Sequence, residues 1–517
     1  MADLRDAGFT DADLVAVRRQ AAPAFVREMA DAIDWGRYGV VGFTTTFDQN
    51  VASIALARMV KERHPQVVVV FGGANCAGEM GRALAAGCPW IDYVVDGEGD
   101  EAFVELLGAL AAGDEPTEIA GVVSAARLGD GAAHADRPLD ELPVAEFGEY
   151  YERARALGLL DASRIKAFRL PFEASRGCWW GQKHHCTFCG LNGQFMGFRQ
   201  KSARRVLDEL AELARRHGVF RFDAVDNIMP ADFLREFLPV LAKEERTYDL
   251  FFEIKSNIGR DEVRALSEAG VNQVQPGVES FSSNVLRLMR KGVSGIQNVN
   301  LLRWARYYEI GASWNVLIGF PGERAEDYDA QAELIGRLTH LEPPYMVSRA
   351  EVQRFSPFHF DRERFPVKSL VPGRSLAYVY PAHFDFEKLA FYFEHQFEET
   401  LPDAAFEPTR AAVERWKDAW AASQPPTLTF RWSPGLLHLE DARGEGPPKL
   451  YAFEGEVAQI YRGASDRPVS PAMLGRRMGL EAAADEIAEV LDLFVEQGLA
   501  MRDQGQYLAL AIPDRQL

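Results

Sequence analysis

The sequence predicts an α/β protein with three folded units joined by less regular segments. Apolar, strand-like segments alternate with helical patterns over the first 125 residues, and the alternation returns between residues 166 and 355. This alternation is typical of parallel sheets covered by helices. From residue 433 onward the pattern changes to short strands, three helices and a terminal hairpin. A chain of 517 residues is long enough for about three domains.

The first unit, residues 1–125, has the pattern of a doubly wound sheet. Its strand-like segments are 38–43, 67–71, 91–95 and 121–124, separated by helical patterns over 49–63, 79–86 and 100–112. Ligands of such sheets bind at the carboxyl ends of the strands. Glycine there lets the backbone approach a ligand closely. The candidate binding residues in the loops after the first three strands are Thr44, Thr45, Gly72, Gly73, Gly97 and Glu98.

A connector over residues 126–165, with Gly129, Gly131, Pro138 and Pro143, separates the first unit from the second. The second unit, residues 166–355, has strand-like segments at 167–172, 219–225, 250–254, 271–275, 313–319 and 347–354, with a helical pattern in each gap. Five or six such units suit an open βα barrel. Barrel enzymes carry their chemistry at the carboxyl ends of the strands, so polar residues there are the candidates for function.

Three cysteines gather directly after the first barrel strand: Cys178, Cys186 and Cys189, in the run RGCWWGQKHHCTFCGLNG. Three thiolates on one loop can hold three irons of a 4Fe–4S cluster and leave the fourth iron open for a ligand. A zinc site is an alternative, with His184 or His185 as its fourth ligand. A redox disulfide between Cys186 and Cys189 is another, but it leaves Cys178 without a role. We favour the cluster.

This loop resembles the cluster motif of radical S-adenosylmethionine (SAM) enzymes, which place three cysteines after the first strand of a partial βα barrel. The usual spacing is three residues and then two. Here seven residues separate Cys178 from Cys186, and Gln182 stands where the first cysteine usually lies. With Trp179, Trp180 and the turn at 190–193, the whole run resembles the radical SAM maturases of ribosomally synthesised peptides (RiPPs), many of which resemble cobalamin-dependent C-methyltransferases.

The resemblance implies that SAM binds at the carboxyl ends of the barrel strands. SAM presents an amino group, a carboxylate, two ribose hydroxyls and an adenine. The residues placed to meet these groups are Asp226 or Asn227 for the amino group, Lys255 beside Glu253 for the carboxylate, Glu279 and Ser280 for the ribose, and the backbone at Gly319 for the adenine. Each is alternatively a solvated strand end or part of an ion pair, such as Glu253 with Lys255. No residue is assigned as catalytic.

The loops of the first unit resemble the cobalamin-binding domain of the same family over roughly residues 37–125. The resemblance therefore implies cobalamin as a further cofactor. The chain has no DxHxxG motif, so no histidine of that motif would ligate the cobalt. Residues 1–36 have a helical pattern and supply neither of the first two strands of the expected fold. Either the start is truncated, which we favour, or the unit is a remnant that no longer binds cobalamin.

The remainder of the chain predicts two further parts. Residues 356–432 are rich in aromatic side chains and have a helical pattern after Phe384, which suits a cap, a wall of the substrate site or simply part of the core. In residues 433–517, strands at 436–439 and 450–453 precede helices at 454–461, 471–478 and 484–497 and a hairpin over 499–511. This order suggests a winged-helix module. It resembles the small domain that captures leader peptides by adding a strand to its sheet edge, although a module that only packs is the alternative.

The composition of the chain limits which partners the protein can bind and in which cellular compartment it is expected. A net charge of −19 argues against nucleic acid, whose binding needs many basic residues. No apolar run reaches the roughly 18 residues of a membrane span, and the start, MADLRDAGFT, lacks the features of a signal peptide. Five cysteines, three of them on one loop, do not make a disulfide framework. We therefore expect a cytoplasmic protein without a membrane or nucleic-acid partner.

The resemblance implies a radical SAM maturase that reductively cleaves SAM and methylates an unactivated carbon of a precursor peptide. Its implied partners are that peptide with its leader segment and an external electron donor of the flavodoxin or ferredoxin type. One alternative is a radical modification of the peptide without cobalamin, such as epimerisation, crosslinking or rearrangement. Another is an iron–sulfur redox sensor that acts through the winged helix.

Overall fold

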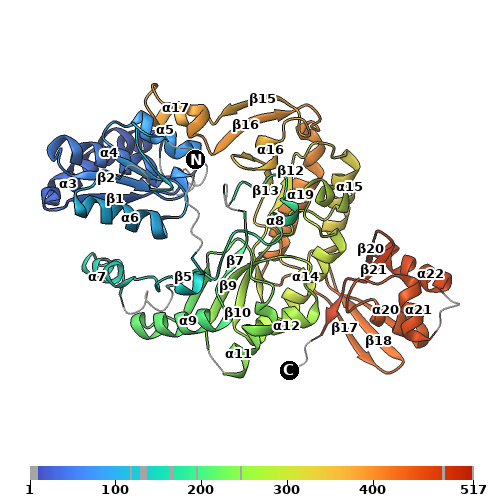
Figure 1. Cartoon of the computed structure of the whole chain (residues 1–517). Coiled ribbons are helices and arrows are strands. Elements are labelled where there is room, and N and C mark those ends of the chain that lie inside the picture. Colours follow the sequence, from blue (N-terminus) through green and yellow to red (C-terminus); the bar gives the residue numbers. More distant parts are fainter. Residues whose placement is uncertain are drawn as a thin grey trace.

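The computed structural model contains an N-terminal α/β unit, a central barrel and a C-terminal module, shown in Figure 1 at the upper left, lower centre and right. It describes residues 10–116, 119–128, 137–161, 168–191, 193, 196–244, 247–479 and 484–514. Part of the expected connector, with Gly129 and Gly131, and the first residue of the strand expected at 167–172 lie outside the described residues.

The N-terminal unit is built on a four-stranded sheet with the order β1-β2-β3-β4. The strands are β1 (Val40–Thr44), β2 (Val68–Gly72), β3 (Tyr93–Val95) and β4 (Val122–Val123), and the helices are α2 (Asp11–Ala16), η1 (Val17–Ala21), α3 (Ala22–Ala32), α4 (Gln49–Arg63), α5 (Glu79–Gly87) and α6 (Gly99–Ala112). The first three strands pair in parallel, and β4 runs antiparallel to β3 at the edge. An antiparallel edge strand on an otherwise parallel sheet is common.

The central barrel forms because its strands pair in parallel. Its main sheet has the order β11-β10-β9-β8-β5, and a bridge from Glu279 to Val316 continues it into β12, which pairs with β13. The strands are β5 (Leu170–Phe172), β8 (Arg221–Ala224), β9 (Asp249–Ile254), β10 (Val271–Pro276), β11 (Gly311–Ala312), β12 (Val316–Ile318) and β13 (Val347–Arg349). The predicted α/β class with a partial βα barrel is confirmed.

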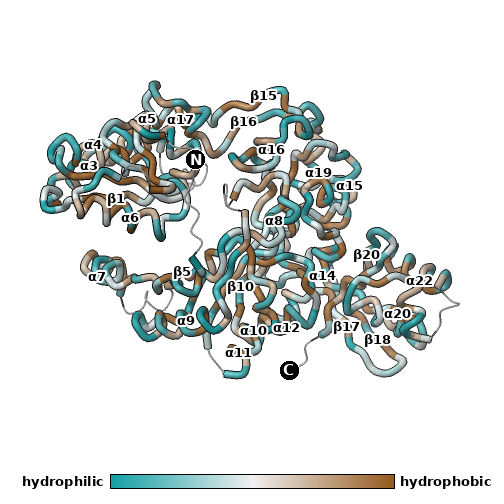
Figure 2. Tube along the Cα trace, in the orientation of Figure 1, coloured by the Kyte–Doolittle hydropathy of each residue, from teal (hydrophilic) through white to brown (hydrophobic). Residues whose placement is uncertain are grey.

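Helices cover the outside of this sheet (Figure 1). They are α9 (Ala203–His217), α10 (Phe233–Glu236), α11 (Leu238–Lys243), α12 (Arg260–Glu268), α13 (Ser283–Leu288), α14 (Gly295–Tyr307) and α15 (Ala325–Arg337). On α9, Leu207, Leu210 and Leu213 recur at three-residue spacing and are buried. Figure 2 shows the strands largely hydrophobic and the outer helices with hydrophilic faces, as an amphipathic covering layer requires.

The predicted last barrel strand, 347–354, is divided in two. Only β13 stays in the barrel, whereas β14 (Val352–Gln353) pairs with β16 (Tyr392–Phe397) in a separate sheet of order β14-β16-β15, where β15 is Val367–Pro372. The helical cap expected after Phe384 is therefore wrong over part of its length. The aromatic residues Phe393 and Phe397 of β16 are buried with exposed residues between them, a period that suits a strand.

This bridging segment, residues 357–397, also covers the N-terminal unit. It contains the short helices α16 (Pro357–Phe360), α17 (Leu376–Val379) and α18 (Phe386–Leu389). Phe384 and Leu389 join the core of the N-terminal unit, and the ring of Phe384 packs on Gly87 so closely that a Cβ there would lie 2.6 Å from it. The segment therefore holds the first unit beside the barrel, as the strands along the top of Figure 1 show.

The C-terminal module, residues 428–514, combines a sheet of order β19-β18-β17-β22 with three helices and a hairpin. Its elements are β17 (Leu428–Ser433), β18 (Leu436–Asp441), β19 (Lys449–Glu454), α20 (Gly455–Gly463), α21 (Pro471–Met478), α22 (Ala484–Glu496), β20 (Ala500–Asp503), β21 (Gln506–Ala509) and β22 (Ile512–Pro513). The sequence pattern missed β17, which follows α19 (Glu407–Trp420) in the segment assigned to the cap.

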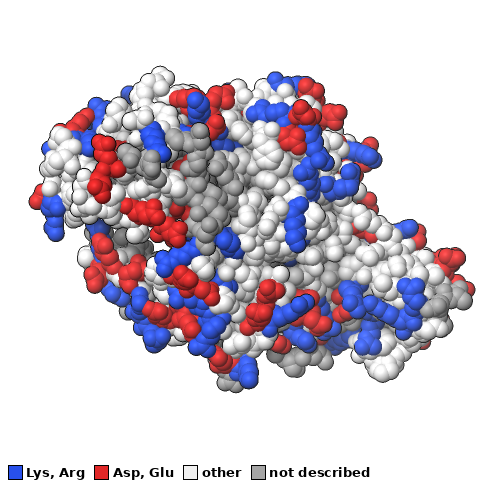
Figure 3. Space-filling model, viewed as in Figure 1, with Lys and Arg blue, Asp and Glu red and all other residues white. Residues whose placement is uncertain are grey.

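Among the described residues, no helix combines the length and apolar character that crossing a membrane requires. On the face in Figure 3, acidic and basic side chains are interspersed over all three units.

A buried arginine joins the C-terminal module to the barrel. Helix α14 lies between them, with ten of its thirteen residues buried. Arg303 on this helix is fully buried and donates to the carbonyl groups of Ser465 (3.0 Å), Leu510 (3.1 Å) and Ala511 (2.6 Å). The module is therefore part of the barrel's own core rather than a loosely tethered domain.

We expect Arg303→Leu to lower the free energy of unfolding by about 3 kcal/mol, because three buried carbonyl groups lose their charged donor. Arg306→Leu, on the exposed side of the same helix, removes a contact with the ring of Trp420 and a favourable charge interaction with Glu342, and should cost at most about 1 kcal/mol. Urea denaturation of the two cluster-free variants measures the difference. Equal stabilities would contradict the role of Arg303.

Candidate functional site

The cysteine loop follows β5 and is fixed to the carboxyl edge of the barrel by buried contacts. Thr187, between the last two cysteines, is fully buried. Its N–H donates to the carbonyl of Met289 (3.1 Å), and its own carbonyl accepts the N–H of Phe358 (3.0 Å). The N–H of Gly190 donates to Oε1 of Gln353 (2.8 Å). The end of α13, α16 and β14 therefore set the orientation of the loop.

The thiols of Cys178, Cys186 and Cys189 lie on this loop, partly exposed. The N–H of Gly181 donates to Sγ of Cys178 (3.2 Å). Burial raises the pKa of Cys189 to about 12, and the neighbouring charge of Cys186 adds to the rise. Burial also raises the pKa of Cys186, while Lys291 lowers it. Thiolates in this environment need positive charge close by, and the donor set, three thiolates on one loop, fits three irons of a 4Fe–4S cluster.

The two histidines that a zinc site would need are engaged elsewhere. The ring of His184 stacks on Trp180 with the ring centroids 4.1 Å apart. Nε2 of His185 lies 2.8 Å from the carbonyl oxygen of Cys189. Among the described residues, no three His, Cys, Asp or Glu side chains gather as a single metal ion requires. Each imidazole therefore already has a partner within the protein.

Trp179 and Trp180 hold the loop against the barrel. Nε1 of Trp179 donates to the carbonyl of Met229 (3.1 Å), and Nε1 of Trp180 donates to the carbonyl of Arg290 (3.0 Å). A Cβ at Gly292 would lie 2.0 Å from the Trp180 ring, so only glycine leaves room for it. Both indoles therefore serve the placement of the cysteines.

The residues expected to bind SAM follow four parallel strands, so the fold brings them to one edge of the barrel. Two of them are engaged with the protein itself. Asp226 is 1% exposed, and its Oδ1 accepts the N–H groups of Ala174 (2.8 Å) and Ser175 (2.9 Å). Burial raises the pKa of Asp226 to about 7. Ser280 is fully buried, and its hydroxyl donates to Oε1 of Gln331 (2.8 Å). Asn227 directly follows Asp226.

Two glutamates and two lysines lie at the same edge. Nζ of Lys291 lies 3.2 Å from Oε1 of Glu279, whereas Lys255 donates to the carbonyl of Lys291 and lies 3.6 Å above the Trp180 ring. Burial raises the pKa of Glu253 to about 6, and Glu279 adds to it. Burial lowers the pKa of Lys255 to about 8, and Lys291 lowers it further. The ion pair at this edge is thus Lys291 with Glu279, not Glu253 with Lys255.

Sequence analysis missed Lys291, because it follows α13 and no strand end or motif marks its position. Glu279 has a φ of +56°, a region that residues other than glycine rarely adopt. Such backbone strain persists only where the surrounding structure holds it, and it concentrates at functional sites. Here the carbonyl of Glu279 accepts the N–H of Leu317 (2.9 Å), which ties the strained residue to β12.

The turn after β12, GFPGE, is organised by its own glutamate. Oε2 of Glu323 accepts the N–H groups of Gly319 (3.1 Å) and Phe320 (2.8 Å) and the hydroxyl of Tyr328. Gly319 has a φ of +89°, and a Cβ there would lie 2.9 Å from Nη1 of Arg349. This left-handed backbone favours glycine, and the side chain of Arg349 packs directly over it.

A hollow of about 620 Å³ lies at the carboxyl ends of β1, β2 and β3. Four of the predicted residues line it, namely Thr44, Gly72, Gly73 and Gly97. Apolar walls that the sequence pattern did not reveal come from Phe43, Val70, Phe71, Val95, Phe103 and Val104. The size and the mostly apolar lining suit a large organic ligand.

Two of the predicted residues do not line this hollow. Thr45 is fully buried, and its hydroxyl donates to the carbonyl of Gly72 (3.3 Å). Glu98 instead pairs with Arg176 and Arg199 of the barrel. The sequence correctly placed Thr45 and Glu98 in loops that follow strands. It could not show which way each side chain points, because that depends on packing.

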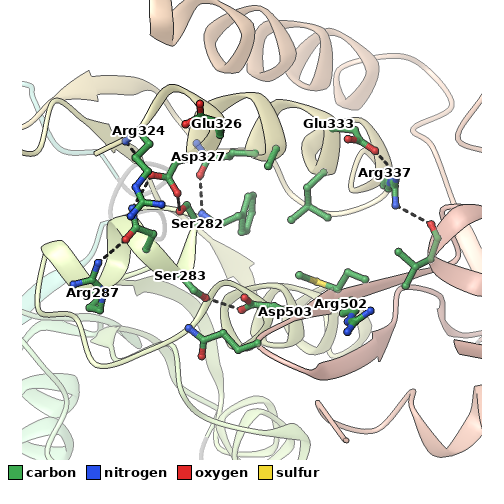
Figure 4. A pocket seen from close by; sticks show the side chains of 18 residues that line it. Ser282, Ser283, Arg287, Arg324, Glu326, Asp327, Glu333, Arg337, Arg502 and Asp503 are labelled. Carbon is green, nitrogen blue, oxygen red and sulfur yellow. Dashed lines mark hydrogen bonds and ion pairs between the residues drawn. The ribbon is translucent and has the colours of Figure 1, made fainter. Parts of the chain in front are cut away.

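A second hollow, of about 800 Å³, lies between α13, α15 and the β20–β21 hairpin (Figure 4). Its acidic groups are used within the protein: Asp503 accepts the hydroxyl of Ser283 (2.6 Å), and Asp327 accepts that of Ser282 (2.7 Å). Since it is formed by the helical outer layer and the module, and no cysteine of the loop lines it, we place the candidate site at the strand ends instead.

Residues 172–335, from the end of β5 into α15, match the family model of the radical SAM superfamily. Among curated proteins, an uncharacterised methyltransferase of Pyrococcus horikoshii is 28% identical over 310 residues, which are 58% of this chain and 64% of that protein. The hopanoid C-3 methylase of Methylococcus capsulatus is 28% identical over 351 residues, 67% of this chain and 63% of that protein. The chain thus spans slightly less than two thirds of these relatives.

Two solved structures share the fold. The cobalamin-dependent SAM radical enzyme OxsB, with aqua-cobalamin and SAM bound, has a TM-score of 0.58 and 13% identity over 77% of this chain and 60% of its own. The radical SAM methyltransferase TsrM from Kitasatospora setae, with cobalamin and a 4Fe–4S cluster bound, has a TM-score of 0.53 and 15% identity over 78% of this chain and 81% of its own. At such low identity the likeness shows the fold alone.

We expect Cys189→Ala to abolish assembly of the cluster, because the remaining two thiols hold too few irons. The wild-type protein, reconstituted anaerobically, should carry about four irons per chain. Cys88→Ala removes a buried cysteine of the N-terminal unit and is the matched control, with unchanged iron content. Iron and sulfide analysis with absorption spectra measures both. Full iron content in Cys189→Ala would contradict the assignment.

We expect Gly73→Ala to destabilise the folded protein, because Gly73 has a φ of +92° and a Cβ would lie 2.6 Å from the carbonyl oxygen of Thr45. The cost should be about 1–3 kcal/mol of unfolding free energy. Gly108→Ala, on the exposed side of α6 with no atom near its Cβ, should instead stabilise by roughly 0.5–1 kcal/mol. Urea denaturation compares the two variants, and the same sign for both would refute the argument.

Proposed function

We propose that this protein, whose residues 172–335 form a radical SAM domain, is a methyltransferase that uses a 4Fe–4S cluster, SAM and cobalamin to methylate a carbon of its substrate. One observation carries the proposal. A single chain places a three-cysteine loop at the carboxyl edge of a partial βα barrel and, joined to it by ion pairs, a large hollow at the carboxyl edge of an α/β sheet. Such an arrangement offers two cofactor sites side by side.

In this proposal Cys178, Cys186 and Cys189 hold the cluster, and the open iron faces SAM. When bound, the cluster and SAM supply the reductive cleavage that makes an unactivated carbon reactive, which no acid or base near neutral pH achieves. The loop contacts of Thr187 and of the two tryptophans keep the cysteines in place. Their half-buried position limits access of water and oxygen to the cluster.

We assign the polar residues of the barrel edge to SAM. Lys255, held over the Trp180 ring, is placed to pair with its carboxylate. Glu253 and Glu279 are the acceptors for its amino group and ribose hydroxyls, with Lys291 orienting Glu279. The backbone at Gly319, beside the side chain of Arg349, is assigned to the adenine. Asp226 and Ser280 stabilise the edge through their buried hydrogen bonds with Ala174, Ser175 and Gln331.

We assign the hollow of the N-terminal unit to cobalamin. Its glycines at positions 72, 73 and 97 leave the strand ends bare, and Phe43, Phe103 and Val104 give it apolar walls. The relatives support this choice, since OxsB and TsrM are described with cobalamin bound. No histidine is present among the described residues that line the hollow, so we expect no protein imidazole from this wall on the cobalt.

The substrate is a separate question. The sequence resemblance implies a precursor peptide, with a leader captured by the C-terminal module. Two of the curated relatives are named for other substrates, a hopanoid and magnesium-protoporphyrin IX monomethyl ester. The peptide, its leader contact and the external electron donor therefore stay predictions. We propose the methyl transfer as the function and make the substrate class an outcome of the experiment.

The test is anaerobic turnover of the reconstituted protein with SAM, a strong reductant and hydroxocobalamin. Candidate acceptors are peptides encoded by neighbouring genes, and lipid or porphyrin extracts of the source cells. Mass spectrometry follows 5′-deoxyadenosine, the product of SAM cleavage, and S-adenosylhomocysteine, the product of methyl transfer. We expect both products, their loss in Cys189→Ala, and a mass gain of one methyl group in the true acceptor.

Other outcomes separate the alternatives. 5′-Deoxyadenosine without S-adenosylhomocysteine would leave a radical enzyme and reject the methyltransferase. Neither product, despite a full cluster, would favour the redox sensor. Glu279→Gln adds a second criterion, because an enzyme should lose SAM binding in equilibrium dialysis whereas a sensor should respond unchanged. Glu333→Gln, which removes a surface pair with Arg337, is the matched control.

A further inference from the structure

The cysteine loop is tied to the N-terminal unit at its beginning. Arg176 on β6 (Ser175–Arg176) stands two residues before Cys178. Its Nη1 lies 2.9 Å from Oε2 of Glu98 and 2.6 Å from Oδ2 of Asp100, both at the start of α6. The facing strand β7 (Arg199–Gln200) adds Arg199, which also pairs with Glu98. The antiparallel strands β6 and β7, which lie before and after the cysteine loop, thus each place an arginine against Glu98.

The loop is tied again at its end. Gly190 follows Cys189, and a Cβ there would lie 2.2 Å from the carbonyl oxygen of Arg354. Arg354 is 3% exposed, and its Nη1 lies 2.8 Å from Oε2 of Glu79, the first residue of α5. Its Nε donates to the carbonyl of Ala390 (2.7 Å). The second tie therefore runs from the loop through a buried arginine to the N-terminal unit.

The acidic partners lie beside the hollow. Asp100 lines it, and Glu98 lies between Gly97 and Gly99, which also line it. In Figure 3, acidic and basic side chains meet where the N-terminal unit approaches the barrel. The Arg176–Glu98 pair has side chains only 25% and 12% exposed. Charge-assisted bonds of this kind, shielded from water, are stronger and more directional than pairs on an open surface.

We propose that Glu98 and Glu79 are positioning residues, which hold the two ends of the cysteine loop against the N-terminal unit, Glu98 beside the hollow and Glu79 through Arg354, and so set the separation between the two cofactor sites. The proposal rests on the proposed function for its catalytic consequence, but not for the geometry. A loop joined at one end only would leave this separation to thermal motion. A misplacement of about 1 Å can lower the rate of a transfer about 100-fold.

The test variant is Glu98→Gln with Glu79→Gln, which removes one charge from each tie without altering the cysteine loop or the lining of the hollow. The control is Asp92→Asn. Asp92 pairs with Lys61 at 2.7 Å, with side chains 28% and 21% exposed, entirely within the N-terminal unit. It matches the partly buried character of the Glu98 pair, but it does not reach the barrel.

The first measurement is hydrogen exchange of the cluster-free protein. In the double variant we expect amides over 174–178 and 189–191 to exchange about tenfold faster, while those of β2 keep their wild-type rate. Asp92→Asn should leave the loop unchanged. A uniform rise over loop and sheet would mean general loss of stability, and unchanged exchange at the loop would overturn the proposal.

The second measurement is turnover of the reconstituted protein. In the double variant we expect 5′-deoxyadenosine per cluster to stay within about twofold of wild type and S-adenosylhomocysteine to fall about 100-fold. A parallel fall of both products would overturn the positioning role. If the wild-type protein forms no S-adenosylhomocysteine, the proposed function fails, and the exchange measurement alone decides whether the two ties hold the loop.

Discussion

The candidate site depends on the parallel pairing of the barrel strands. Because β5, β8, β9, β10 and β12 run in one direction, their carboxyl ends meet at one edge. Residues separated by up to about 140 positions, from Cys178 to Gly319, are thereby brought together. An antiparallel strand at any of these places would carry its loop to the opposite end. The direction of the strands therefore decides which residues can form the candidate site, and the identities of those side chains decide what the site can bind.

The edge holds more charge than a protein interior normally accepts, and several of these charges have a partner in the protein. Asp226 binds two backbone N–H groups, and Lys291 pairs with Glu279. An unpaired buried charge would cost several kcal/mol. The consequence is a rigid polar surface beside the cysteine thiols, in which the strained backbone of Glu279 is held by its bond to β12. Such preorganisation favours binding of a polar ligand, because few groups must move to receive it.

The two α/β units are held together by two kinds of contact. The bridging segment packs Phe384 into the core of the N-terminal unit, an apolar contact that gives cohesion. The ion pairs of Arg176 and Arg354 lie next to the cysteine loop and fix the orientation of the loop relative to the N-terminal unit. Apolar packing is nearly indifferent to small rotations, whereas a charged hydrogen bond is not. The combination explains how a loop that contains only the short helix α8 (Gly181–His184) can have a defined place relative to a hollow in another unit.

The sequence by itself determined the α/β class, the three-cysteine loop and the glycine-rich strand ends, since periodicity and close spacing are local properties. Only the tertiary structure decided that Glu98 faces the barrel and not the hollow, that Lys291 joins the site, and that the strand at 347–354 divides into β13 and β14. These outcomes depend on partners up to hundreds of residues away, such as Glu79 for Arg354. The hydrophobic periodicity of a sequence shows which face of a helix or strand a side chain occupies. Which residue that side chain contacts depends on packing and charge in the assembled fold.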